Sequence, residues 1–331
     1  MPTGRSEFVY ELQVCRWAEL AWPPDGGTPA FLVARQLGTK RRRWDTVVVE
    51  TDPEGLAARR RFGDRKLDSD LLHIVRHAPA EWAFYRDALP DPGYPWRYVR
   101  EAIHRADDRG IVDTRRDGNK IEIRRIAPYP DWVDRLIAIE NKPDLDASAA
   151  RQLADQLTHD VDAGLADEVW MATERTEDRV EPALLESLPV EAGILTTEFE
   201  AGVDAASAAV EWYPTRLLTA GTDADSDGDR HSRRLELAER AFGRGWRNYG
   251  RTMRPDCRFF ELHRDGRALL PWCAAKGRHQ SSMVCGSSCD DFQPEPPAWR
   301  TRGWPIEGGP GKGITQLLAD RADRTNRPGR K

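Results

Sequence analysis

A glutamate and a lysine stand two positions apart at the end of an apolar stretch, residues 134–142. In a β-strand the side chains alternate between faces, so Glu140 and Lys142 would point the same way. Such a pair suits the hydrolysis of a phosphodiester once a second carboxylate joins it. Two carboxylates hold Mg²⁺, which prefers oxygen ligands, and the ion activates a water molecule. The lysine can orient that water and offset the charge of the phosphate.

The second carboxylate has two candidates. Asp45 opens a β-branched stretch, residues 45–50, that reads as a buried strand and would pair near Glu140. Asp134 is the other candidate, because it would lie on the same face of the same strand as Glu140. Six residues of extended chain span roughly 20 Å, which is too far for one ion without a bend. Asp45 is therefore the preferred second ligand.

The elements that would position these side chains alternate between helix and strand. Helices are expected at 7–20 and 147–164, and a polar helix at 232–249. Strands are expected at 31–37, 45–50, 134–142, 168–173 and 192–197. An acidic stretch, 222–230, reads as a surface loop. This order predicts an α/β fold.

The order resembles the core of the PD-(D/E)XK nuclease superfamily over residues 7–50 and 131–200. In that core a helix with a glutamate precedes a strand opening with aspartate, and a later strand ends in Glu-x-Lys. The resemblance implies a restriction-endonuclease-like mixed sheet flanked by helices. It also implies a Mg²⁺- or Mn²⁺-dependent site. The matching residues are Glu11 (less well Glu7 or Glu19), Asp45, Glu140, Lys142 and, on the following helix, Gln152 with Gln156 one turn later. The chain also resembles uncharacterised proteins of haloarchaea.

The chain departs from that pattern in the long gap between Asp45 and Glu140. Helices at 69–77, 81–89 and 94–109 are expected there, followed by a hairpin around Asp117-Gly118. This is the order of a winged helix-turn-helix, whose third helix and wing typically meet DNA. The candidate DNA-binding residues are Arg97, Arg100, His104, Arg105, Arg115, Arg116 and Lys120. They would contact phosphates. Two alternatives are a solvated arginine-rich face and a protein-binding module.

Four cysteines lie within 33 residues near the C-terminus, with 15, 11 and 3 residues between them. Four thiolates suit Zn²⁺ or a [4Fe–4S] cluster. Only one close pair is present, so the spacing is not a standard zinc signature. The alternative is four reduced thiols. The expected ligands are Cys257, Cys273, Cys285 and Cys289, whereas Cys15 falls on the inward side of the first helix as a core residue.

The net charge and the lack of long apolar runs limit which partners the protein could have. The net charge of −5 excludes a global basic field, so a DNA-binding surface must be local. No signal peptide and no apolar run of about 18 residues is visible, which predicts a cytoplasmic protein without a membrane partner. The composition does not indicate an oligomeric state.

We therefore expect three units and a tail. Residues 1–55 and 128–220 would form the nuclease-like core, 65–127 the inserted winged helix, and 250–295 the four-cysteine module, with a partly disordered tail at 296–331. The expected function is a Mg²⁺-dependent deoxyribonuclease in DNA repair, processing or defence. The alternative is a catalytically inactive DNA-binding or regulatory protein with a structural metal site.

Overall fold

The computed structural model describes residues 7–26, 30–39, 42–175, 186–217, 224–246, 257–265, 268–281, 285 and 289–293. The tail at 296–331 lies outside these residues, as does part of the expected cysteine module. No helix among the described residues is long and apolar enough to cross a bilayer.

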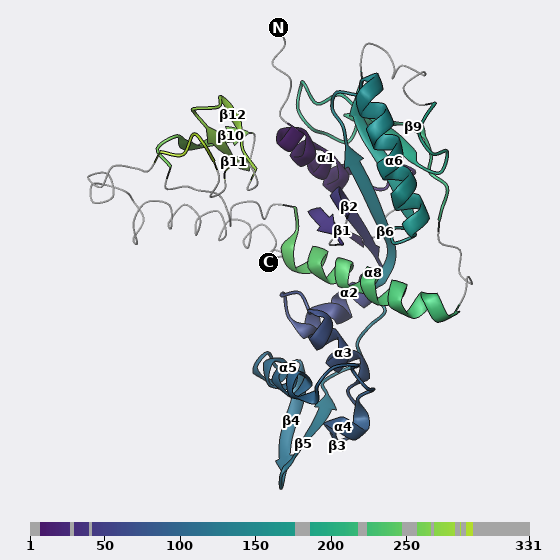
Figure 1. Cartoon of the computed structure of the whole chain (residues 1–331), viewed down its shortest axis with the longest axis vertical. Coiled ribbons are helices and arrows are strands. Elements are labelled where there is room, and N and C mark those ends of the chain that lie inside the picture. Colours follow the sequence, from purple (N-terminus) through teal and green to yellow (C-terminus); the bar gives the residue numbers. More distant parts are fainter. Residues whose placement is uncertain are drawn as a thin grey trace.

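A six-stranded mixed sheet forms the centre of the chain (Figure 1). Its spatial order is β1 (Ala30–Gly38), β2 (Arg43–Thr51), β6 (Val133–Asn141), β7 (Glu168–Glu174), β8 (Gly193–Thr197) and β9 (Ala208–Trp212). The β6–β7 and β7–β8 pairs are parallel, and the other pairs are antiparallel. A mixed α/β fold is thus confirmed.

Helices cover both faces of this sheet. Helix α1 (Glu7–Ala21) packs on one face, where Cys15 and Trp17 join Val48 and Ile137 in a core, as expected for Cys15. Helices α6 (Ala147–Ala163) and α8 (Ala224–Arg244) cover the other face. The expected acidic loop at 222–230 is wrong, because the backbone is already helical from Ala224.

The chain between β2 and β6 forms a separate lobe, although these two strands are neighbours in the sheet (Figure 1). Its elements are α2 (Pro53–Arg59), η1 (Arg60–Phe62), α3 (Ser69–His77), β3 (Ala83–Phe84), α4 (Tyr85–Ala88), α5 (Trp96–Asp108), β4 (Val112–Asp117) and β5 (Lys120–Arg125). The expected helix at 81–89 is wrong in its first half. Ala83 and Phe84 instead pair with β5, opposite Ile123 and Glu122.

A buried ion pair holds the start of this lobe to α8. Arg59 and Glu239 are both fully buried and are joined by two hydrogen bonds. Tyr129 also donates to Glu239 Oε1 over 2.6 Å. Removing one partner of such a pair leaves an uncompensated buried charge, so the contact strongly favours this one arrangement.

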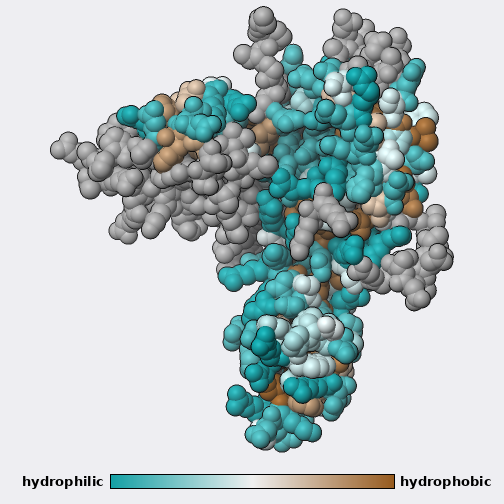
Figure 2. Space-filling view, in the orientation of Figure 1, coloured by the Kyte–Doolittle hydropathy of each residue, from teal (hydrophilic) through white to brown (hydrophobic). Residues whose placement is uncertain are grey.

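A small antiparallel sheet follows near the C-terminus, with β10 (Phe260–Asp265), β11 (Ala268–Cys273) and β12 (Arg278–His279). The surface in the view of Figure 2 is mostly hydrophilic over the central sheet and the inserted lobe. Three large apolar side chains are exposed next to or on the edge strand β9, namely Val190, Trp212 and Tyr213.

Candidate active site

Asp45 and Glu140 lie side by side at one end of the central sheet. The pairing of β2 with β6 ends at Thr46 opposite Ile139, so Asp45 and Glu140 are the next opposed positions. The backbone N–H of Asn141 donates to Asp45 Oδ2 over 3.1 Å. The alternative ligand, Asp134, is exposed at the far end of β6.

Burial makes this carboxylate pair costly to ionise. Glu140 is 7% exposed, and its burial, together with the charge of Asp45, raises its pKa to about 7. Burial also raises the pKa of Asp45, with the charge of Glu7 adding to the effect and the Asn141 hydrogen bond opposing it. A cation placed between the two carboxyl groups would therefore stabilise their ionised forms.

An arginine already supplies positive charge on one side of the pair. Arg42, in the turn between β1 and β2, donates from Nη2 to Glu140 Oε2 and to Asp160 Oδ2, each over 2.9 Å. Its Nε lies 3.1 Å from both Asp160 oxygens. The charges of Glu140 and Asp160 and the hydrogen bonds to them raise the pKa of Arg42, although burial acts in the opposite direction.

Helix α6 contributes Asp160 to the site. The expected Gln152 is exposed, and among the described residues no hydrogen bond links it to either carboxylate, so its role stays a prediction. Asp160 lies two turns later on a neighbouring part of the helix surface. Neither Asp160 nor Arg42 was predicted from the sequence, in which the run of basic residues at 40–43 is the signal for Arg42.

Glu11 reaches the site indirectly, through a glutamine. Its carboxylate pairs with Arg35 over 2.8 and 3.0 Å. Gln36 Nε2 then donates over 3.0 Å both to Glu11 Oε1 and to Asp45 Oδ1. Gln36 has a φ of +54°, the only positive φ of a non-glycine residue in the described part of the chain. Strained backbone of this kind clusters at functional sites.

Lys142 lies at the rim of the same site. Its Nζ donates over 2.9 Å to Oε1 of Glu7, one helical turn before Glu11 on α1. The charges of Glu7, Glu140 and Asp45 raise the pKa of Lys142 against the opposing effect of burial, so it stays protonated at neutral pH. Its charge in turn lowers the pKa of Asp45.

Further arginines surround the hairpin that carries Asp45. Arg240 of α8 donates from Nη1 to the carbonyl oxygen of Gly38 over 2.6 Å. Burial and the charges of Arg35, Arg240 and Arg43 lower the pKa of Arg244. The charges of Arg35, Arg240 and Arg43 thus act on Arg244, and such a group of positive charges suits an anionic ligand.

The expected DNA-binding residues of the inserted lobe are all exposed, but two of them are paired. Arg105 contacts Asp68 over 2.6 Å and Asp70 over 3.1 Å. Arg115 contacts Glu122 over 2.6 Å. The other exposed members of the set are Arg97, Arg100 and His104 on α5, and Arg116 and Lys120 on the hairpin.

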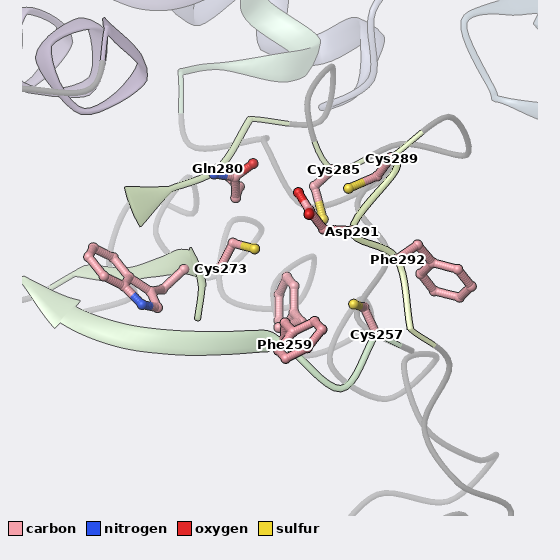
Figure 3. A pocket seen from close by; sticks show the side chains of 10 residues that line it. Cys257, Phe259, Cys273, Gln280, Cys285, Cys289, Asp291 and Phe292 are labelled. Atoms are coloured by element: carbon pink, nitrogen blue, oxygen red, sulfur yellow. The ribbon is translucent and has the colours of Figure 1, made fainter. Parts of the chain in front are cut away.

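The four C-terminal cysteines, Cys257, Cys273, Cys285 and Cys289, line one pocket (Figure 3). None of the five cysteines of the chain forms a disulfide. Within the described residues, no three His, Cys, Asp or Glu side chains are gathered closely enough to enclose a metal ion. Any ion at either candidate site would therefore draw ligands together or complete its shell with water.

A model of DUF5787, a family of unknown function, matches residues 32–294 of the chain. The matched stretch includes Asp45, Glu140 and Lys142 as well as the four C-terminal cysteines, and it begins after α1. No curated protein and no solved structure matches the chain.

Proposed function

The chain belongs to DUF5787, and we propose that it is a divalent-metal-dependent nuclease of the PD-(D/E)XK type that hydrolyses phosphodiesters of DNA. The observation that carries the proposal is a pair of carboxylates on two neighbouring strands, the half-buried Asp45 and the buried Glu140, with Lys142 two residues further along. The cellular setting would be DNA repair, processing or defence.

The donor set at the pair fits Mg²⁺ or Mn²⁺. Two oxygen-only side chains face each other, and the pKa of each is raised partly by neighbouring negative charge. Mg²⁺ usually binds proteins through one or two carboxylates and keeps several water molecules, so a third close protein ligand is not needed. When bound, the ion would polarise the phosphate and acidify a water molecule.

The remaining side chains would hold the substrate and the attacking water. Lys142 is protonated, and among the described residues its Nζ donates only to the exposed Glu7, so the ammonium can turn to a phosphate oxygen or a water. Glu11 and Gln36 hold Asp45 in place. Arg42 would stabilise the ionised form of Glu140.

Two basic surfaces support DNA as the substrate. Arg43 lies two residues before Asp45 on β2, and its charge acts on Arg244 of α8, so arginines of both elements would suit the flanking phosphates. The inserted lobe has helices followed by a β-hairpin, which resembles a winged helix-turn-helix. Its exposed Arg97 and Arg100 on α5 would add sequence-independent, salt-sensitive affinity.

The test is cleavage of single- and double-stranded DNA by the purified full chain, in Mg²⁺, in Mn²⁺ and in EDTA. We expect metal-dependent cutting that falls about a hundredfold or more in Glu140→Ala and in Lys142→Ala, the typical cost of losing one group that stabilises transition-state charge. Glu198→Ala is the matched control, since Glu198 is an exposed glutamate paired with Arg175 on the same sheet. Cutting that persists in Glu140→Ala would overturn the proposal.

One observation favours a second candidate, a non-catalytic DNA-binding protein. Arg42 already forms ion pairs with Glu140 and Asp160, and Arg35 with Glu11, so the acidic groups have internal partners. DNA binding with no cutting in any metal would favour this alternative.

A further inference from the structure

The pocket in the C-terminal sheet gathers the four cysteines from separate elements. Cys257 precedes β10, Cys273 ends β11, and Cys285 and Cys289 follow β12. In Figure 3 the four sulfur atoms point toward a common space, with Phe259 and Asp291 at its border. The antiparallel register places Cys273 opposite Phe260, which brings the start of β10 and the end of β11 together.

The backbone around the thiols is arranged as a series of turns. The carbonyl oxygen of Cys257 accepts from the N–H of Phe260 over 3.0 Å, and that of Cys289 accepts from Phe292 over 3.1 Å. The carbonyl oxygen of Cys273 accepts from Gly277 over 2.8 Å, where Gly277 has a φ of +61° that suits glycine. Three of the four cysteines therefore start a hydrogen-bonded turn, which fixes the local backbone that carries the thiol.

The small sheet buries few apolar side chains of its own. Leu270, together with the partly buried Phe260 and Cys285, packs against the core on the α1 face of the central sheet. Among the described residues of this segment, few apolar side chains are buried. They are Cys257, Leu270 and Pro271. The pocket is instead walled by partly exposed aromatic rings, including Phe260, Trp272 and Phe292. A metal held by the thiols would add stability that this small apolar core does not supply, and none of the cysteines forms a disulfide.

A positive charge is placed beside the thiols. Lys276 Nζ lies 3.4 Å from Cys289 Sγ and 3.4 Å from Asp291 Oδ2. Four thiolates around a divalent ion carry a net negative charge, and an ammonium that donates to one sulfur offsets it. Groups that hydrogen-bond to ligand atoms also orient them.

We propose that Cys257, Cys273, Cys285 and Cys289 bind one metal centre through four thiolates, and that this centre closes the C-terminal sheet. Each thiol gives up its proton to solvent on binding, with no change of oxidation state for Zn²⁺. A single Zn²⁺ and an iron–sulfur cluster share this ligand chemistry. The site does not depend on the proposed nuclease activity, and its test needs no DNA.

The experiment measures metal and sulfide in the full chain purified without chelators, one sample under air and one under anaerobic conditions. We expect about one Zn²⁺ per chain, or iron with acid-labile sulfide and a brown visible absorption. Cys285→Ala and Cys289→Ala should each reduce the bound metal about tenfold. Cys15→Ala is the matched control, because Cys15 is a buried thiol on α1 outside the pocket, and it should keep the metal.

A second measurement covers variants that fail to fold. A mercurial reagent titrated into the wild-type chain should release the metal in step with the modification of four thiols, as followed by a zinc or iron indicator dye. Metal-free protein under both conditions, with thiols equally reactive before and after added Zn²⁺, would overturn the proposal. So would metal loss in Cys15→Ala equal to that in Cys285→Ala.

Discussion

Arg42 Nη2 lies 2.9 Å from Oε2 of Glu140, although the two residues are 98 positions apart. The turn between β1 and β2 thus places a guanidinium against the carboxylate that would bind a metal. The same nitrogen also contacts Asp160 of α6, so one arginine serves two buried acids. Arg42 and a divalent cation would therefore stabilise the same negative charges.

The contacts of Arg42 with Glu140 and Asp160 predict the effect of Arg42→Met, which keeps an unbranched apolar side chain and removes the positive charge. In EDTA at pH 8 we expect the free energy of unfolding to fall by about 3 kcal/mol, since two buried carboxylates lose their partner. Saturating Mg²⁺ should restore part of the loss through binding to the folded state. Urea unfolding followed by tryptophan fluorescence measures both. Arg43→Met, a change at the exposed neighbouring residue, is the control. An equal loss with and without Mg²⁺ would show that the arginine and the ion do not share these charges.

The pKa of Glu140, raised by burial and by Asp45 to about 7 from an ordinary 4.5, predicts a pH dependence. Because the folded state holds this proton more tightly than the unfolded state, the group's contribution to stability is complete below pH 4.5 and is lost as the pH rises through 7. The difference amounts to about 3 kcal/mol. In EDTA, Glu140→Gln should therefore lose less stability than the wild type between pH 5 and pH 8.

Binding of Mg²⁺ should show the opposite sign, because the ion needs the ionised carboxylate. Its affinity, measured by calorimetry, should increase as the pH rises through 7 and level off above it. Glu198→Gln removes an exposed carboxylate and should follow the wild type in both measurements. A Glu140→Gln protein whose stability falls with pH as steeply as that of the wild type would contradict this assignment.

The positive φ of Gln36 predicts an unusual order of stability for two substitutions. In a strand, glycine is normally less stable than alanine by about 0.5–1 kcal/mol. At Gln36 both changes remove the bridging amide, but alanine also keeps a left-handed strain of about 1–2 kcal/mol that glycine lacks, which exceeds the usual glycine penalty. Gln36→Gly should therefore unfold at higher urea than Gln36→Ala. The same two changes at Leu32, on the same strand, should show the normal order. If alanine is the more stable residue at both positions, the strained backbone is not present in solution.

Much of the fold could be predicted from local patterns. The strand expected at 134–142 is β6 (Val133–Asn141), and the helix expected at 69–77 has those bounds in the structure. Alternation of apolar residues and the cap at Asp68 act over a few residues, so a window of sequence contains them. Asp45 could be paired with Glu140 because Asp45 opens its expected strand and Glu140 lies near the end of another, which brings them together when the strands are antiparallel.

The parts that could not be predicted depend on contacts between distant segments. Ala83 and Phe84 become a strand only because β5 lies beside them. The position of Asp160 at the site depends on where α6 crosses the sheet relative to the turn that carries Arg42. The link from Glu11 to Asp45 depends on one strained dihedral angle at Gln36, for which the sequence has no signal.

The inserted lobe offers a last prediction, which compares two arginines of α5. Both Arg100 and Arg105 are exposed, but Arg105 is held by Asp68 and Asp70, whereas no ion pair involves Arg100 among the described residues. A phosphate contact contributes about one unit to the slope of log affinity against log salt concentration. Arg100→Ala should lower that slope by about one and weaken binding to every DNA sequence alike, as measured by fluorescence anisotropy. Arg105→Ala should leave the slope unchanged, because its charge is already neutralised. Equal effects of the two substitutions would mean that α5 does not meet DNA through this face.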